Sequence, residues 1–150
     1  MRIAIRLLSF AAFTTALASC SLGDENELEL TVSASSAIVS PGEAVRISVT
    51  AENVGSTRIS WGHGSSTCQL HVVARVDGSD YLAPDITRMC TADYVEMALD
   101  PGQGRTESFD WTGHIAKDSL VMLPPGTYEI RGAAGDNWKS PPVSLQVVTP

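Results

Sequence analysis

The chain has 150 residues, which allows one domain, or one domain with an appendage. Its 17 acidic residues outnumber its 10 lysines and arginines, for a formal net charge of −7. An acidic surface repels phosphate backbones, and the basic residues form no clustered stripe, so nucleic acid is not an expected partner. A negative balance of this kind otherwise indicates ordinary solubility.

Residues 1–19 have the pattern of an export signal. Arg2 and Arg6 precede an apolar run that extends to Leu17. A mature membrane-spanning helix needs about 20 apolar residues, so this run is too short to be one. The four residues that end at Cys20, Leu-Ala-Ser-Cys, resemble a bacterial lipobox. The resemblance implies cleavage after Ser19 and lipidation of Cys20, and the alternative is an ordinary cleaved signal followed by a chance cysteine.

Residues 20–26 are predicted to be the lipidated cysteine and a flexible polar tether, which reaches about 20 Å when extended. In lipoproteins of many diderm bacteria, a serine after the cysteine, such as Ser21 here, favours delivery to the outer membrane. The predicted location is therefore the cell envelope, extracytoplasmic and lipid-anchored, at the outer membrane if the bacterium is diderm. The membrane partner is reached through the lipid on Cys20.

The chain has three cysteines, and lipidation of Cys20 leaves Cys68 and Cys90 as the possible intramolecular pair. Outside the cytoplasm such a pair is expected to be oxidised to a disulfide. The disulfide would close the loop from Cys68 to Cys90, which would stabilise the fold by about 3 kcal/mol in the chain-entropy model. The alternative is two free, buried thiols.

From Glu27 onward, apolar residues recur with a period of two, which is typical of strands with one buried face. This alternation is found in residues 28–34, 45–51, 70–76, 95–99, 107–111, 128–130 and 143–147. Asp77-Gly78 tolerates the positive φ angles of a tight hairpin, so Tyr81-Leu82 is expected to pair back. Residues 136–142 are expected to be the hairpin connection before the last strand.

These elements predict an all-β fold. About seven or eight short antiparallel strands, with turn signals every ten residues or so, favour an immunoglobulin-like β-sandwich over residues 27–150. An up-and-down barrel is the competing architecture, but the uneven loop lengths favour Greek-key crossovers. No helical period is long enough to predict a helix.

The sequence predicts neither an enzyme nor a metal or cofactor site. The chain has three histidines, His63, His71 and His114. None belongs to a ligand-spaced motif, and a zinc site would need three or four converging groups. His63 is followed by two nearby serines, but the G-x-S-x-G pattern of a nucleophile elbow is missing, so this stretch is read as a loop. His71 is expected to be a surface residue.

Three tryptophans could form a binding platform if they were exposed. Trp111 shares a strand face with Phe109 and is expected in the core. Trp61 is expected at the end of a strand, packed on the disulfide. Trp138 is expected to be the most exposed of the three, although local packing is favoured over binding.

Several segments together resemble the intracellular proteinase inhibitor family of Bacillus type, the BsuPI domain. The resemblance covers about Glu43 to Val148, and the segments that carry it are Cys68-Gln69-Leu70, Asp77-Gly78, Leu99-Asp100-Pro101-Gly102, Trp111 and Leu123-Pro124-Pro125-Gly126-Thr127-Tyr128. It implies an immunoglobulin-like sandwich and inhibition of serine proteases. The chain departs from the family's name because it carries an export signal, and no reactive-site motif transfers to numbered positions.

The leading hypothesis is a non-enzymatic, lipid-anchored envelope protein that binds another protein, with proteinase inhibition as one version. In that version the contact loop is the segment from Tyr81 to Thr91, where Arg88 and Met89 would offer side chains to a protease pocket. One alternative is an accessory domain that pairs with another envelope component through an exposed sheet edge. The other is a glycan or small-ligand binder that uses Trp138 or Trp61.

Overall fold

The computed structural model describes residues 27–40, 42–63, 69–76, 78–82, 93–114, 122–135 and 137–149. Within these ranges the backbone forms strands, turns and bends and no helix, so the predicted all-β fold is confirmed. No helix of the described residues is long and apolar enough to cross a membrane.

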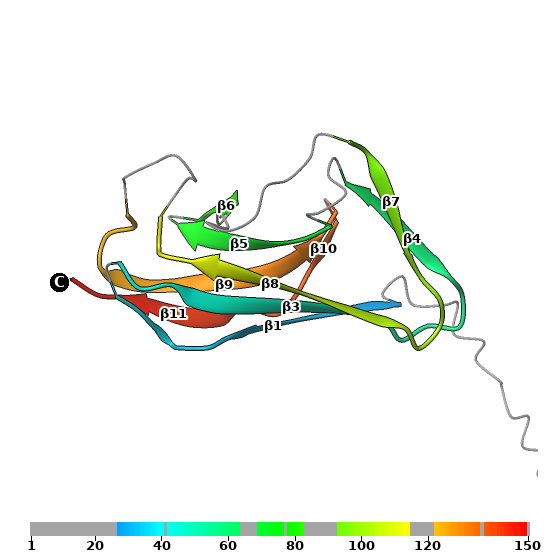
Figure 1. The fold of residues 1–150 in the computed structure, drawn as a ribbon, viewed down its shortest axis with the longest axis horizontal. Helices are drawn as coiled ribbons and strands as arrows, with labels where there is room; N and C mark the ends of the chain where they lie inside the picture. The colour runs from blue at the N-terminus through cyan, green and yellow to red at the C-terminus, as the bar shows by residue number, and fades with distance from the viewer. Residues whose placement is uncertain are drawn as a thin grey trace, which may run out of the picture.

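The described residues form two sheets and a separate two-stranded ribbon (Figure 1). The first sheet has the order β1-β3-β8, formed by Leu28–Ala34, Val45–Asn53 and Gly104–Trp111. The second has the order β2-β11-β9-β5-β6, formed by Ile38–Val39, Val143–Val147, Gly126–Ala134, Leu70–Val76 and Ser79–Leu82, and β10 (Trp138–Lys139) also pairs with β9. The ribbon pairs β4 (Ile59–His63) with β7 (Val95–Leu99).

The two sheets form an immunoglobulin-like β-sandwich, as predicted, with more and shorter strands than the expected seven or eight. The described residues contain eleven strand segments, partly because the first strand changes sheets. β1 pairs antiparallel with β3, and after a short link β2 lies parallel to β11 in the other sheet. The expectation that all strands are antiparallel therefore fails at this one pair. The predicted hairpin after Asp77-Gly78 is confirmed, because Val76 pairs with Ser79 and Gly78 has a φ of 81°.

The stretch from residue 136 to residue 142 was expected to be a connection, but part of it is a strand. Trp138 and Lys139 pair with Ala134 and Ala133, and the ladder resumes with Val143 opposite Ile130. The register shifts by one residue between these pairs, which marks a bulge. Pro141 and Pro142 cause it, because proline has no N–H to donate to the ladder.

Ser140 replaces the hydrogen bonds that the two prolines cannot make. Its N–H donates to the Gly132 carbonyl at 2.8 Å, and its Oγ accepts the Gly132 N–H at 2.9 Å. The same hydroxyl donates to the Pro141 carbonyl at 2.8 Å. Ser140 is buried, so these bonds leave its polar groups satisfied in the bulge.

The core fills the space between the sheets with the inward residues of the alternating strands. Ile47, Leu70, Ile130 and Leu145 are fully buried, and Trp111 joins them as predicted. Gly132 allows close approach of the two sheets: a Cβ there would lie 2.5 Å from Cγ1 of Val49.

The outer face of the first sheet is polar and paired strand to strand. Arg46 donates two hydrogen bonds to the Asp110 carboxylate, at 2.8 and 2.9 Å, and these bonds lower the pKa of Asp110 below its usual 3.8. The next rows pair Ser48 with Ser108 at 3.0 Å and Thr50 with Thr106 at 2.8 Å between hydroxyl oxygens.

The β4–β7 ribbon continues the β3–β8 pair past a sharp corner and leans over one end of the sandwich (Figure 1). Asn53, the last residue of β3, lies at the corner and is fully buried. Its Nδ2 donates to the carbonyls of Thr57 and Leu99 at 2.8 and 2.9 Å, and its Oδ1 accepts the Gly55 N–H at 3.0 Å.

The main chain of Asn53 is also paired at this corner. Its N–H donates to the Gln103 carbonyl at 2.9 Å, and its carbonyl accepts the Gly102 N–H at 2.8 Å. One residue therefore holds both connections of the ribbon, 54–58 and 100–103. Gly102, with a φ of 75°, makes the tight turn of the second connection.

We predict that Asn53→Ala destabilises the fold by about 2–4 kcal/mol, because it leaves several buried donors and acceptors unpaired. Urea unfolding of chains that carry Cys20→Ser measures this loss. Ser60→Ala, on the exposed face of β4, is the control and should change stability by about 0.5 kcal/mol or less. Equal stability of the two variants would contradict the role assigned to Asn53.

Candidate functional site

The sequence-predicted site residues lie outside the described residues. This holds for the lipidation site Cys20, for the predicted disulfide partners Cys68 and Cys90, and for the candidate contact residues Arg88 and Met89. Their roles stay predictions.

The histidines do not form a site in the described residues, where no group of three His, Cys, Asp or Glu side chains could hold a metal ion. His71, expected to be a surface residue, lies on β5 and is half-buried. His114 closes a loop at the end of the sandwich: its Nδ1 lies 2.6 Å from Oγ1 of Thr112, and its carbonyl accepts the Trp111 indole N–H at 3.0 Å.

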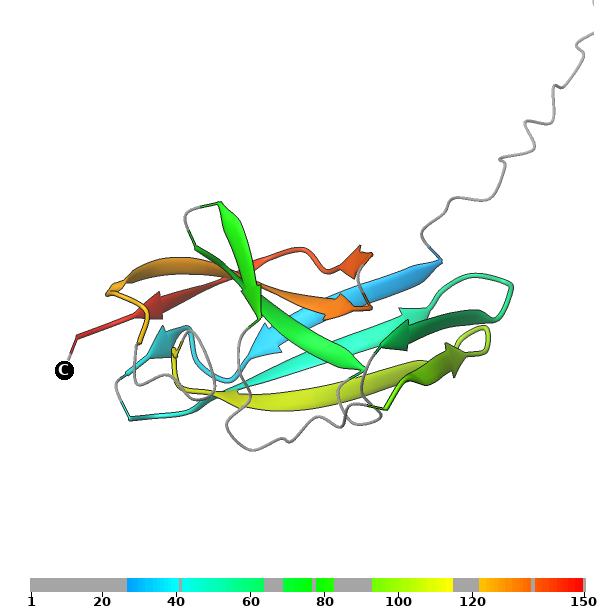
Figure 2. The same ribbon diagram turned by 90° about the horizontal axis from the view of Figure 1, so that it is seen from above.

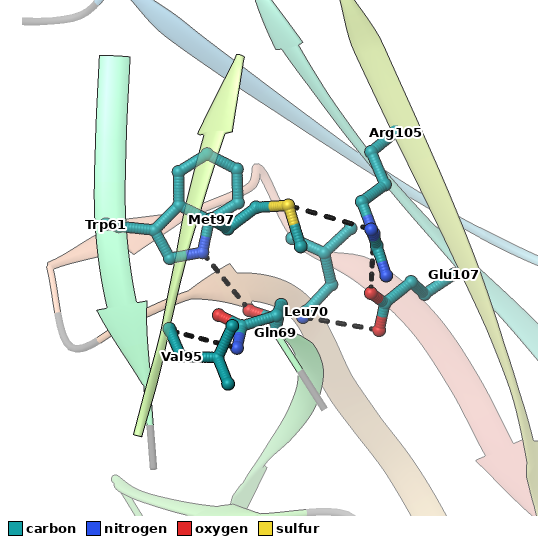
Figure 3. A network of polar contacts seen from close by, with 7 residues as sticks. All are labelled: Trp61, Gln69, Leu70, Val95, Met97, Arg105 and Glu107. Carbon is teal, nitrogen blue, oxygen red and sulfur yellow. Dashed lines mark hydrogen bonds and ion pairs between the residues drawn. The ribbon is translucent and has the colours of Figure 1, made fainter. Parts of the chain in front are cut away.

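A buried polar network holds the start of β5 against the ribbon (Figure 3). Gln69, which follows Cys68 in the chain, is fully buried and donates from Nε2 to the Val95 carbonyl at 3.1 Å. The Trp61 indole N–H donates to the Gln69 carbonyl at 3.4 Å. Trp61 is 4% exposed and lies in the middle of β4, not at a strand end as expected.

The same network includes a buried carboxylate on β8. Glu107 is 8% exposed; its Oε1 accepts the Arg105 Nε–H at 2.8 Å and its Oε2 accepts the Leu70 N–H at 3.4 Å. Arg105 also contacts the Met97 sulfur at 3.6 Å. These groups connect β8 with β5 and with β7, and the pairing offsets the cost of burying the charge. We interpret the network as structural.

A hollow of about 460 Å³ opens beside β1. One wall is the start of β1, and the other is the β10 segment of the second sheet; the residues that matter for its chemistry are Leu28, Glu29, Leu30, Val54, Trp138 and Lys139. Val54 is 54% exposed, one of few large apolar side chains so exposed in the described chain. The hollow therefore combines an apolar floor with a charged rim.

Trp138 forms a wall of this hollow and is held from behind by Trp61. The two rings meet edge to face, with centroids 6.4 Å apart and planes at 61°. Trp138 is half-buried and is the most exposed of the three tryptophans, as predicted. Trp138 also packs against the core, so one part of its ring is buried and another part is accessible.

The free edge of β1 runs along the hollow. In the described chain β1 pairs with β3 alone. The Val54 N–H donates to the Glu27 carbonyl and the Ser35 N–H donates to the Arg46 carbonyl, both at 2.8 Å, so odd-numbered residues of this strand are the hydrogen-bonded ones. In an antiparallel pair the alternate residues point their main-chain groups the other way. Leu28, Leu30 and Val32 therefore direct N–H and C=O groups outward along the edge.

The sequence did not identify the free edge of β1 as a candidate binding site. The alternation in residues 28–34 predicted the strand, but the identity of its neighbours depends on the topology. One signal was present: the segment contains no lysine and no proline, the residues that commonly protect an edge.

Comparisons with known proteins support the fold alone. No family model and no curated protein sequence matches the chain. A β-glucosidase from Listeria innocua in complex with isofagomine is similar over 83% of this chain, with a TM-score of 0.52 and 16% identity. The β-glucosidase EmGH1 from Erythrobacter marinus is similar over 81%, with a TM-score of 0.50 and 14% identity.

This chain spans 16% and 15% of the length of those two enzymes, so their activity does not transfer to it. The CARDB domain of PF1109 from Pyrococcus furiosus, in complex with di-metal ions, is similar over 81% of this chain and 87% of its own. Its TM-score is 0.46 at 16% identity, too low to support an argument about ligands.

We predict that Trp61 and Trp138 are energetically coupled, because an edge-to-face pair contributes about 0.5–1.5 kcal/mol beyond its buried area. A double-mutant cycle with Trp61→Leu and Trp138→Leu, followed by urea unfolding, measures the coupling. Trp138→Leu combined with Ile38→Thr, at an exposed site on β2, serves as the additive control. Additivity of the two tryptophan variants would show that the contact does not hold Trp138 in place.

Proposed function

We propose that this chain is a non-enzymatic, lipid-anchored protein of the cell envelope whose β-sandwich binds another protein through the free edge of β1. The edge and the hollow beside it carry the proposal. Extended segments add to exposed sheet edges through main-chain hydrogen bonds, and side-chain pockets next to the edge supply specificity. Both parts of such a site lie together here.

A protein partner explains more of the site than a glycan does. Trp138 could stack on a sugar ring, so a glycan is the alternative ligand. The outward N–H and C=O groups of Leu28, Leu30 and Val32, however, repeat every two residues, about 6.8 Å apart. Another extended main chain has that repeat and both kinds of group, so it can satisfy the whole row.

The predicted anchor would place this site close to the membrane. The start of β1 and the C-terminal end of the described chain lie at opposite ends of the sandwich (Figures 1 and 2). The hollow is lined by the first residues of β1 and lies at the end from which the chain continues back to Cys20. A tether with a reach of about 20 Å would hold the edge near envelope proteins at the membrane surface.

The proteinase-inhibitor version remains a narrower proposal. It rests on the BsuPI resemblance and would use Arg88 and Met89, next to Cys90, to contact a serine protease. These residues lie outside the described chain, so this version rests on the sequence alone.

We predict that the native protein is cleaved after Ser19, acylated on Cys20 and oxidised between Cys68 and Cys90. Intact-mass analysis reports all three: the loss of the signal, the added acyl mass and the loss of two protons. The Cys20→Ser variant is the control and should carry no acyl mass. A native mass without acyl groups would overturn the anchoring part of the proposal and leave protein binding open.

We predict that a photo-crosslinking residue at position 54 captures one stoichiometric protein partner in intact envelopes, because Val54 lies at the rim of the hollow. The matched control is the same residue at position 38, since Ile38 is 48% exposed on β2, away from the hollow. Capture from both positions, or from neither, would contradict binding at this edge. Capture of carbohydrate from position 54 would favour the glycan alternative.

The inhibitor version has its own discriminating result. Soluble protein with Cys20→Ser would slow the hydrolysis of a small chromogenic substrate by a trypsin-like or subtilisin-like protease, stoichiometrically. Degradation of the protein without such slowing would count against it.

A further inference from the structure

We infer that the β1 edge selects an extended peptide segment with large apolar side chains on one face and a lysine or arginine between them on the other. The apolar side chains would enter the hollow, and the basic side chain would lie beside Glu29. The inference rests on the proposed function, and it names the class of segment that the edge accepts.

The facing of the added strand follows from the pleat. Side chains on neighbouring strands point to the same face where residues lie opposite one another. Residues opposite Leu28 and Leu30 would therefore point inward with them, toward Trp138 and the space between the sheets. A residue opposite Glu29 would point to the outer, solvent face of the first sheet.

The inward positions call for apolar side chains. Leu28 and Leu30 are buried in the core, and the exposed Val54 lies beside them at the rim. The hollow of about 460 Å³ is larger than one apolar side chain needs. Lys139 lines the opposite wall.

The outward position calls for a cation. Glu29 lies directly opposite Glu52 in the β1–β3 ladder, and both side chains are exposed. Like charges placed opposite each other are unfavourable. On the far side Glu52 is opposite Gly104, so the third residue of this row offers no side chain to offset the two charges. An added strand extends the row at its other end, next to Glu29, where a lysine or arginine would pair with it.

In the neighbouring rows of the same face, the side chains of β3 and β8 are paired with each other. Thr50 and Thr106 are hydrogen-bonded to each other, as are Ser48 and Ser108. The Arg46–Asp110 row is balanced within itself. Among the described rows of this face, the Glu29–Glu52 row has an uncompensated charge, and it adjoins the part of the edge that lines the hollow.

A synthetic peptide tests the inference. We choose the nine-residue sequence Thr-Val-Thr-Leu-Lys-Leu-Thr-Val-Thr, which is the same in both directions and so pairs in either orientation. Its leucines face one side and its lysine the other. A second peptide replaces the lysine with glutamate, and a third carries N-methyl groups on both leucines. A fourth has the composition of the first in a shuffled order without alternation.

Binding to the chain that carries Cys20→Ser is followed by two-dimensional NMR and by tryptophan fluorescence. We expect the lysine peptide to bind about threefold or more tighter than the glutamate peptide. The N-methylated and shuffled peptides should bind at least tenfold more weakly than the lysine peptide, because they cannot form the ladder with alternating side chains. Shifted resonances should lie in Leu28 to Val32 and in Trp138.

Two charge variants separate local pairing from the overall negative charge. Glu29→Lys should reverse the preference, so that the glutamate peptide binds more tightly. Glu96→Lys, at an exposed position on β7, changes the net charge by the same amount and should leave the preference as it is. Equal binding of the lysine and glutamate peptides, or the same effect of both variants, would overturn the charge selection.

The two levels of the proposal fail in different ways. If all four peptides fail to bind, but a partner is still captured from position 54, the inferred peptide class is wrong and protein binding at the hollow stands. If the N-methylated peptide binds as well as its parent, pairing with the edge is wrong. If neither peptides nor a captured partner are found, the proposed function fails together with the inference.

Discussion

The side chain of Asn53 makes three hydrogen bonds inside the protein, and the position of the candidate site depends on them. They end β3 and turn the chain into the ribbon, so that the next residue, Val54, emerges at the surface. The Val54 N–H still donates to the Glu27 carbonyl, which keeps Val54 beside the start of β1. A buried amide thus determines where the exposed Val54 lies beside the hollow.

The ribbon that leaves this corner supports the other wall of the hollow. β4 brings Trp61 over the end of the sandwich, where it contacts Trp138 on β10. The buried groups of Gln69 and Glu107 connect the ribbon, β5 and β8 beside Trp61. One wall of the hollow is therefore backed by a buried ring, in contact with Trp138.

The sequence predicted the strands well where burial alternates along one segment, as in β1, β3, β8 and β11. It could not predict which edges stay unpaired, because that depends on residues distant in the chain. The bulge at Ser140 shows the same limit: residues 136–142 are predicted as a hairpin connection, and only the register shows that β10 and β11 both pair with β9. The role of Asn53 could not be predicted either, because its five bonded partners come from both sides of the corner.

The edges of the two sheets differ in how well they are protected. β2 has two residues and β6 has four, and short edges are poor templates for pairing. β8 carries Arg105 and Glu107, which are bonded to β7 and β5. β1 has seven residues, and none of their side chains belongs to such a network in the described chain.

A ladder along one strand of this length gives modest affinity by itself, and the charge at Glu29 adds preference more than strength. A lipid on Cys20 would confine the domain and an envelope partner to the same surface, which raises their effective concentration and makes a weak edge sufficient.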